Sequence, residues 1–237
     1  MTLNQMLFLL GLGLCLFVTY RLIRSKLRLP GAEINYYQDF VDPDLRLKLI
    51  QELRALTWTK DHVTTTTSHY RLNRGTNVFG DTSLLKRTPP KIWGDTRQIQ
   101  VWTPSMLELK HQVEAQTGYS YNVCLVNYYM NGKDHIYWHS DKEELGDQNS
   151  IASISLGASR HFLFRVKSTL SSEFLWGIRR ISGKCWRRRD IILDLELTSG
   201  SLLFMGKKCQ ELYEHTLPKD ERVTTERFNL TFRRFHY

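Results

Sequence analysis

The pattern of hydrophobic and polar positions sets the first segment of the chain apart from the rest. Residues 2–20 carry no charged side chain, and most of this run reads LFLLGLGLCLFVTY. Its length nearly matches the roughly 20 residues with which a helix crosses a bilayer. The run stops at Arg21, and further basic residues follow up to Arg28. The pattern therefore predicts an N-terminal transmembrane anchor with a basic flank over residues 1–28.

The basic flank also predicts the orientation of this anchor. Positive residues beside a membrane helix stay on the cytoplasmic side. A cleavable signal peptide would carry its charge before the apolar run and a small-residue cleavage site after it, and the sequence has neither. A helix buried in a protein core is the alternative, although such a helix is rarely apolar all round. The expected localisation is a single-pass membrane protein whose following domain is cytosolic or faces the nucleus.

Residues 32–237 read as one domain in which helices precede strands. An Asp-Pro pair, followed by apolar residues at helical spacing, predicts an amphipathic helix near 43–56. A Ser-x-x-Glu capping box predicts a second helix that opens at Ser105 and ends at Gly118.

After Gly118 the period of the hydrophobic pattern becomes two, which is typical of strands. The predicted strands are SYNVCLVNYYM, DHIYWHSD, SIASISL, HFLFRVK, DIILDLEL, SLLFM and RFNLTFRRF. Helices followed by many short strands predict an α+β domain. The expected core is a double-sheet jelly roll, that is, a double-stranded β-helix with supporting N-terminal helices.

Charge narrows the class of partner. The formal net charge of +9 indicates a polyanion, either nucleic acid or an anionic membrane face, although a basic surface that only aids solubility is the alternative. Residues 167–190 interleave basic and aromatic side chains. Such a segment suits single-stranded nucleic acid, but also a membrane surface or a solvated loop. The four cysteines show no C-x-x-C spacing, which argues against a zinc site or a disulfide framework.

The strand DHIYWHSD carries candidate metal chemistry. His139 and Asp141 are two residues apart, so in a strand their side chains share a face and can converge on one ion. Two histidines and one carboxylate on one side of a metal are the arrangement of non-haem iron(II) oxygenases. His215 is the candidate for the second histidine. His-x-Asp alone is a weak signal, because an isolated histidine is more often a hydrogen-bonded core residue.

The last predicted strand, RFNLTFRRF, has two contrasting faces. Arg227, Asn229, Thr231 and Arg233 share one face, and large apolar residues occupy the other. Arginines on the inward face of a core strand are costly unless an anion meets them. A dicarboxylate would satisfy both arginines, whereas a strand with exposed arginines is the alternative.

Taken together, the motifs resemble those of the AlkB family of iron(II)- and 2-oxoglutarate-dependent dioxygenases, and most closely its nucleic-acid-repair branch. The resemblance runs from about Phe79 to Phe235 and rests on FGD, N-x-Y, HSD, SISLGASR, GSLLFM and RFNLTFR in this order. It implies that Fe(II) is bound by His139, Asp141 and His215. It implies that 2-oxoglutarate, which reacts together with O2, is bound by Asn127, Tyr129, Arg227, Asn229 and Arg233.

The resemblance also implies a reaction and a substrate. The reaction is the oxidative removal of N-alkyl groups, such as methyl, from damaged bases in DNA or RNA, for example N1-methyladenine and N3-methylcytosine. Three residues match substrate-binding positions: Glu143, Phe79 and Arg160. Each has a plainer interpretation, respectively a loop charge, a core aromatic and a structural arginine.

The sequence contains no obvious apolar finger for invading a duplex, so the favoured partner is alkylated single-stranded nucleic acid. A membrane-anchored 2-oxoglutarate-dependent hydroxylase or demethylase of a protein or lipid is the second hypothesis. A catalytically inactive binding module is the third, and the complete set of metal and co-substrate residues argues against it.

The segment between the first two predicted strands decides which side chains face the metal. Asn131-Gly132 is typical of a two-residue hairpin turn. A loop of that length would turn Asn127 and Tyr129 away from the face of His139, and a one-residue change would exchange the faces. We therefore predict an odd-length loop, a bulge, or strands that are not direct partners.

Overall fold

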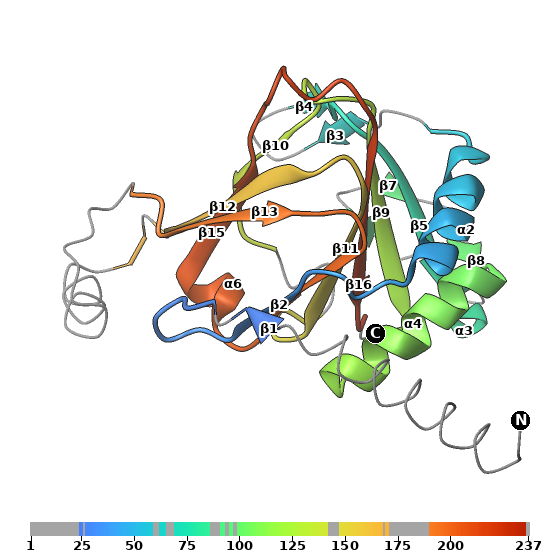
Figure 1. Cartoon of the computed structure of the whole chain (residues 1–237), viewed down its shortest axis with the longest axis horizontal. Helices are drawn as coiled ribbons and strands as arrows, with labels where there is room; N and C mark the ends of the chain where they lie inside the picture. The colour runs from blue at the N-terminus through green and yellow to red at the C-terminus, as the bar shows by residue number, and fades with distance from the viewer. Residues whose placement is uncertain are drawn as a thin grey trace, which may run out of the picture.

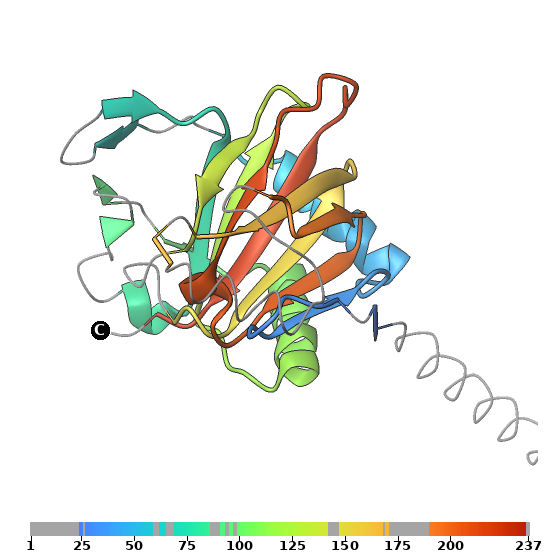
Figure 2. The ribbon, with the colours of Figure 1, turned by 90° about the vertical axis from the view of Figure 1, so that its left-hand side faces the viewer.

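Two β-sheets packed face to face build the domain, and helices cover the outer side of the larger sheet (Figure 1). The structure is a computed structural model, which describes residues 24–25, 27–58, 62–64, 69–85, 91–92, 95–96, 99–141, 147–167, 169–170 and 190–235. Figure 2 shows the same ribbon turned by 90°. This arrangement agrees with the predicted double-sheet β core and supporting helices.

The larger sheet contains eight strands among the described residues, in the order β1-β2-β14-β11-β16-β9-β5-β8. Their bounds are Arg24–Ser25 for β1, Ile34–Tyr37 for β2, Ser201–Met205 for β14, Ile151–Gly157 for β11, Arg227–Arg233 for β16, Val123–Tyr129 for β9, Gly75–Gly80 for β5 and Gln100–Val101 for β8. Strand β16 pairs antiparallel with both β11 and β9, so it lies in the middle of the sheet.

The smaller sheet has the order β10-β15-β12-β13. Its bounds are Ile136–His139 for β10, Tyr213–Leu217 for β15, Arg160–Val166 for β12 and Leu193–Leu197 for β13. Two short antiparallel pairs lie apart from both sheets: β3 (His62–Thr64) with β4 (His69–Arg71), and β6 (Lys91–Ile92) with β7 (Asp95–Thr96). Each segment predicted as a strand contains one, whereas β15 and the strands before Gly118 were not predicted.

The two long helices begin at capped turns. Helix α2 (Pro43–Arg54) begins after Asp42, whose carboxylate accepts a 3.0 Å hydrogen bond from the Leu45 amide, as predicted. Helix α4 (Pro104–Thr117) ends at Gly118, which has a positive φ of 77°, also as predicted. Its N-cap is Thr103 and not Ser105. The short helices are α3 (Thr82–Leu85) and α6 (Cys209–Leu212).

The alternation along β16 separates the core from the space between the sheets. Phe228, Leu230 and Phe232 are fully buried in a cluster with the apolar faces of α2 and α4. The helices therefore seal this face of the sheet with apolar contacts. The intervening residues of β16 face the smaller sheet, as the sequence pattern predicted.

The described residues contain no helix long and apolar enough to cross a membrane. This corrects the expected fold class, which placed one transmembrane helix before the jelly roll, and with it the expected single-pass membrane localisation. The predicted span itself, residues 2–20, lies outside the described residues. In the predicted basic flank, Arg24–Ser25 pairs with Tyr36 and Tyr37 of β2. Its backbone thus extends the larger sheet instead of continuing a helix.

Of the three arrangements predicted for the segment after β9, the structure has the one in which β9 and β10 are not direct partners. Strand β9 lies between β16 and β5, whereas β10 pairs with β15 in the other sheet. Gly132 donates from its amide to the carbonyl of Val223 at 2.7 Å and accepts from the Asp220 amide at 2.9 Å. A Cβ at Gly132 would lie 1.7 Å from the Asp220 carbonyl oxygen. This glycine thus permits two loops to approach closely.

The first prediction concerns Phe79, which belongs to the cluster between the larger sheet and the helices and is 2% exposed. We expect Phe79→Ala to lower the free energy of unfolding by about 3–5 kcal/mol, because it leaves a cavity in a packed core. Urea denaturation measures this change. Leu47→Ala, at a position that is 57% exposed, serves as control and should change stability by less than about 0.5 kcal/mol. Equal stabilities of the two variants would contradict the core position.

Candidate functional site

Three side chains converge where β10 and β15 meet. His139 is the last residue of β10 and pairs with His215 at the centre of β15, and Asp141 follows two residues after His139. Their potential ligand atoms all lie within 4.8 Å of one another. His139 Nε2 is 3.8 Å from Asp141 Oδ1, and His215 Nε2 is 3.9 Å from Asp141 Oδ2. The structure thus brings together the three residues predicted to bind a metal.

A register shift in β10 contributes to this convergence. Ile136 pairs with Leu217 and His139 with His215, so three steps along β10 match two along β15. Such a bulge re-aims side chains at the end of a strand. Thr216 helps to hold the bulged strand, because its hydroxyl donates to the Ile136 carbonyl at 2.6 Å.

The surroundings of both histidines favour the neutral form of the imidazole ring, which is the form that binds metal. His139 Nδ1 lies 2.7 Å from the Tyr137 carbonyl oxygen. A carbonyl only accepts, so Nδ1 carries the proton and Nε2 keeps its lone pair. Burial lowers the pKa of His139. Burial, and then the nearby His139, lower the pKa of His215 to about 3. At neutral pH both rings are therefore uncharged, as metal binding requires.

Asp141 is held as a carboxylate. Burial alone would raise its pKa, but Arg233 and the two histidines hold it well below the usual range. Arg233 Nη2 is 2.7 Å from Asp141 Oδ1. The Asp141 amide donates to Gln210 Oε1 at 2.9 Å, which fixes the backbone that carries the carboxylate. Gln210 was not predicted from the sequence, because nothing in the sequence around it indicates a contact with Asp141.

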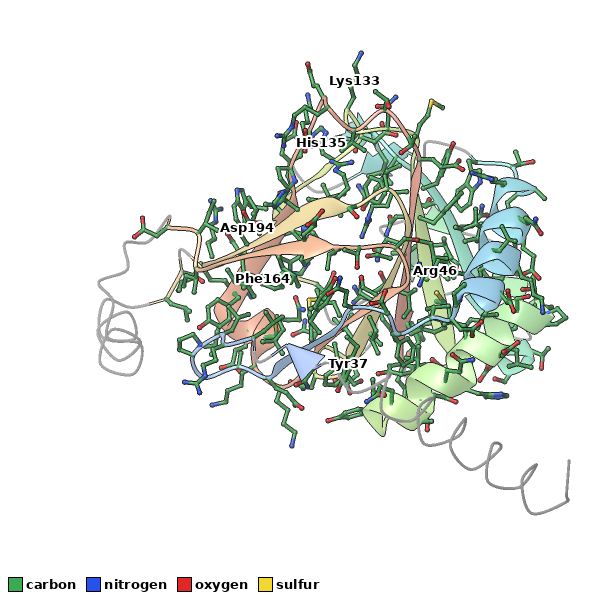
Figure 3. The ribbon with its side chains drawn as sticks, viewed as in Figure 1. Tyr37, Arg46, Lys133, His135, Phe164 and Asp194 are labelled. Carbon is green, nitrogen blue, oxygen red and sulfur yellow. The ribbon has the colours of Figure 1, made fainter. Side chains whose placement is uncertain are left out.

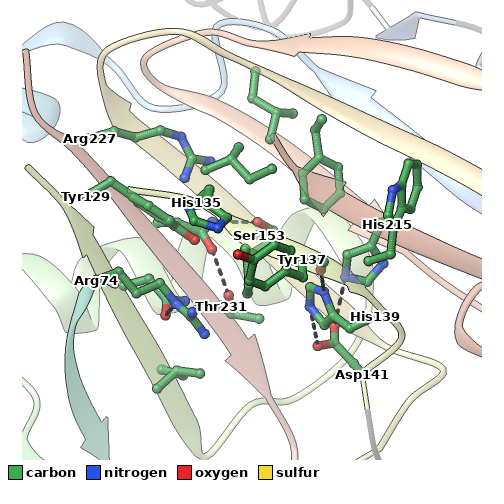
Figure 4. A pocket seen from close by; sticks show the side chains of 18 of the residues that line it. Arg74, Tyr129, His135, Tyr137, His139, Asp141, Ser153, His215, Arg227 and Thr231 are labelled. Atoms are coloured by element: carbon green, nitrogen blue, oxygen red, sulfur yellow. Dashed lines mark hydrogen bonds and ion pairs between the residues drawn. The ribbon is translucent and has the colours of Figure 1, made fainter. Parts of the chain in front are cut away.

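A cavity of about 320 Å³ extends from this cluster between the two sheets. Figure 4 shows side chains from both sheets pointing into it. All five residues predicted to bind 2-oxoglutarate line it: Asn127, Tyr129, Arg227, Asn229 and Arg233. Small-molecule sites of this kind begin near 300 Å³, so the cavity suits a compact ligand.

Several N–H groups in this cavity are buried and have no hydrogen-bond partner among the described residues. They are Arg227 Nε and Arg233 Nε and Nη1. Arg227 Nη2 donates to Ser155 Oγ at 2.8 Å, and burial lowers the pKa of Arg227 to about 10. Buried donors on cations are costly without an acceptor. The donor set therefore fits a small anion with more than one carboxylate.

Arg74 is a third arginine in the cavity wall, and sequence reasoning missed it. It directly precedes β5, is buried, and donates from Nε to Asn127 Oδ1 at 2.8 Å. Thr76 pairs with Asn127, so alternation places Arg74 on the same inward face. Residues 57–100 show no dominant period in sequence, and only the short run Gly75–Gly80 could have revealed this face.

Two of the three predicted substrate residues, Phe79 and Arg160, do not line the cavity. Phe79 lies in the core on the opposite face of the larger sheet. Arg160 is buried and donates to backbone carbonyls, including those of Asp134 at 3.1 Å and Pro218 at 2.6 Å. It thereby ties the loop before β10 to the loop after β15. Glu143 lies outside the described residues, as does most of the basic segment 167–190.

The chain is similar to known proteins of one family. The family model described as the 2OG-Fe(II) oxygenase superfamily matches residues 33–233. "DNA oxidative demethylase ALKBH2" of Homo sapiens is 37% identical over 142 residues, which are 60% of this chain and 50% of that protein. "Alpha-ketoglutarate-dependent dioxygenase alkB homolog 3" of Homo sapiens is 35% identical over 135 residues, which are 56% of this chain and 43% of that protein. These relatives confirm the resemblance to the AlkB family.

The chain spans about half the length of the curated relatives it matches. A solved structure, "The structure of OsALKBH1", superposes with a TM-score of 0.57 and 17% sequence identity over 89% of this chain and 99% of that one. At this identity the likeness concerns the fold alone, and it supports the jelly-roll core.

Gln210 provides a test of how the cluster is positioned. We expect Gln210→Met to weaken the binding of Mn(II), a stable substitute for Fe(II), roughly 10- to 100-fold, because groups that orient a metal ligand typically carry this much affinity. Calorimetric titration measures the change. Gln51→Met, at an exposed position on α2, is the control and should bind Mn(II) like the unchanged chain. Unaltered affinity in Gln210→Met would remove Gln210 from this role.

Proposed function

The chain belongs to the 2OG-Fe(II) oxygenase superfamily, and we propose that it oxidatively removes N-alkyl groups, chiefly methyl, from damaged bases in DNA or RNA. N1-methyladenine and N3-methylcytosine are the proposed target bases. One observation carries the proposal: the His139–Asp141–His215 cluster shares a cavity with buried arginine N–H groups that lack partners.

In this proposal, each part of the cavity holds one reactant. The three clustered side chains would hold Fe(II). The five predicted co-substrate residues would hold 2-oxoglutarate, with Arg227 and Arg233 at opposite ends of β16 each available to one carboxylate. When bound, iron with 2-oxoglutarate and O2 supplies the oxidation of the N-alkyl carbon. The protein itself supplies position, charge and a largely buried cavity.

The proposed substrate follows from charge and relatedness. The net charge of +9 favours a polyanion, and a curated relative is named as a DNA demethylase. We favour single-stranded nucleic acid, because the sequence offers no apolar finger for opening a duplex. A base carried in a single strand can enter a pocket without first breaking a pair.

The proposal predicts that methylated nucleic acid stimulates 2-oxoglutarate turnover. Release of succinate is measured with Fe(II) supplied, using single-stranded DNA or RNA containing N1-methyladenine or N3-methylcytosine, the same strands unmethylated, and the methylated duplexes. We expect only methylated strands to stimulate turnover and to lose their methyl group. Stimulation by none of them would refute the substrate class, and turnover with a protein or lipid instead would favour the rival hydroxylase.

Matched variants test the metal cluster in the same assay. His139→Ala, Asp141→Ala and His215→Ala should each abolish turnover while circular dichroism shows an intact fold. His161→Ala is the control, because His161 is exposed and pairs with Asp194 at 2.7 Å, away from the cluster. Retained activity in any cluster variant would exclude that residue as a ligand.

Arg227 tests the co-substrate site separately from the metal. We expect Arg227→Met to raise the KM for 2-oxoglutarate about 100-fold, because removing one partner of a buried charge pair typically costs about 3 kcal/mol. Affinity for Mn(II) without 2-oxoglutarate should stay within about twofold. Arg222→Met, at an arginine whose side chain is 84% exposed, is the control. An unchanged KM would refute the inward-facing arginine as a co-substrate contact.

A further inference from the structure

Tyr137 combines two properties that rarely occur together. It lines the cavity that holds the metal cluster, yet it is 74% exposed. Among the large hydrophobic side chains of the described residues, it is the most exposed one. Figure 4 shows Tyr137 beside His139 and Asp141 of the cluster. Tyr137 belongs to β10, and His135 lies directly before this strand. Tyr137 therefore lies at the boundary between the cavity and solvent.

The surroundings hold this ring in place. His135 packs edge-on against it, with ring centroids 4.5 Å apart and an interplanar angle of 88°. His135 is itself buried, and its Nδ1 lies 3.0 Å from the Lys133 carbonyl oxygen. An edge-on contact with a fixed imidazole supports one side of the phenol ring. The ring is thus supported from within and open toward solvent.

The backbone of β10 fixes the ring relative to the metal cluster. The Tyr137 carbonyl accepts the hydrogen bond from His139 Nδ1. The next side chain, Trp138, lies under the guanidinium of Arg165 at 4.3 Å, and Arg165 is paired with Glu214 at 2.8 Å. This contact links β10 to Arg165 on β12 and, through the ion pair, to Glu214 on β15. Tyr137 therefore keeps a defined position next to a candidate metal ligand.

An exposed aromatic face at this position offers one kind of contact above others. Every nucleobase has a flat π-face, and stacking on an aromatic side chain tolerates all four bases. A phenol also suits the boundary between an apolar site and water, since its hydroxyl remains solvated. Burying such a ring under a base recovers the free energy lost by its exposure.

We propose that Tyr137 is a stacking residue for the base next to the methylated base, and that it positions the strand over the cavity. This inference rests on the proposed function, because it requires a nucleic acid substrate. The methylated base occupies the cavity, and its neighbour lies on the Tyr137 ring. The contact would select for a strand whose bases can unstack from one another.

The test measures binding of a fluorescently labelled single-stranded DNA with one N3-methylcytosine to the full chain, with Mn(II) and 2-oxoglutarate present. We expect Tyr137→Ala to weaken binding roughly 10- to 100-fold, the range typical of one aromatic–base stack. Tyr137→Phe and Tyr137→Trp should bind within about threefold of the unchanged chain, because both retain an aromatic face. Tyr137→Leu should behave like Tyr137→Ala, since it keeps apolar surface without a ring.

A second series replaces the base on either side of the methylcytosine with an abasic site. At one of the two positions, the abasic site should weaken binding to the unchanged chain as much as Tyr137→Ala does. The same abasic site should not weaken binding to Tyr137→Ala any further, because both changes remove the same contact. Additive losses on both sides would overturn the proposal. So would normal binding by Tyr137→Ala or by Tyr137→Leu. Met130→Ala, an exposed residue that does not line the cavity, is the control.

Succinate release separates this inference from the proposed function. If methylated strands stimulate the unchanged chain and Tyr137→Ala equally at subsaturating concentration, the stacking role fails and the demethylase function stands. If no strand binds or stimulates the unchanged chain, the function fails and the inference with it. If Tyr137→Ala raises the KM for 2-oxoglutarate without affecting strand binding, the ring serves the co-substrate and the proposal is overturned.

Discussion

Strand β16 has to satisfy two incompatible environments at once, and the rest of the domain is arranged around this constraint. One face must be sealed from water, which α2 and α4 accomplish by packing on Phe228, Leu230 and Phe232. The other face carries buried arginines, which demand polar partners. The smaller sheet encloses these arginines without neutralising them fully, because Asp141 reaches only Arg233. The result is a cavity lined by buried cationic side chains.

The sequence could predict features that depend on short-range alternation. The two faces of β16 follow from a period of two, and the structure agrees. His139 and Asp141 do lie together as predicted, although β10 already ends at His139 and a register shift contributes to their convergence. Strand β15 escaped prediction for a related reason. One of its buried residues is His215, which is polar. The segment Glu214, His215 and Thr216 therefore shows no alternation of hydrophobic and polar residues from which a strand could be predicted.

Features that depend on distant contacts could not be predicted in the same way. Asn131-Gly132 is typical of a local hairpin turn. In the structure, Gly132 instead allows the backbone at Asp220 to approach closely, because a Cβ would collide with it. Phe79 looked like a substrate contact, but the pairing of β5 with β9 turns it toward the helices. The N-cap of α4 is Thr103, and both Thr103 and Ser105 donate to Glu52 on the distant helix α2, at 2.6 and 2.7 Å. The membrane helix was inferred from hydrophobicity alone, and no helix among the described residues meets that requirement.

Arg233 touches both halves of the site, which has a thermodynamic consequence. Its Nη2 pairs with Asp141, and its Nε and Nη1 have no hydrogen-bond partner in the part of the chain that the structure describes. A cation that draws charge from Asp141 loosens this pair and frees the guanidinium for an anion. An anion that engages the guanidinium in turn leaves Asp141 more available to the cation. Coupling of this kind is reciprocal by necessity, so each ligand raises the affinity for the other. The state with only one of the two ligands bound is therefore sparsely populated.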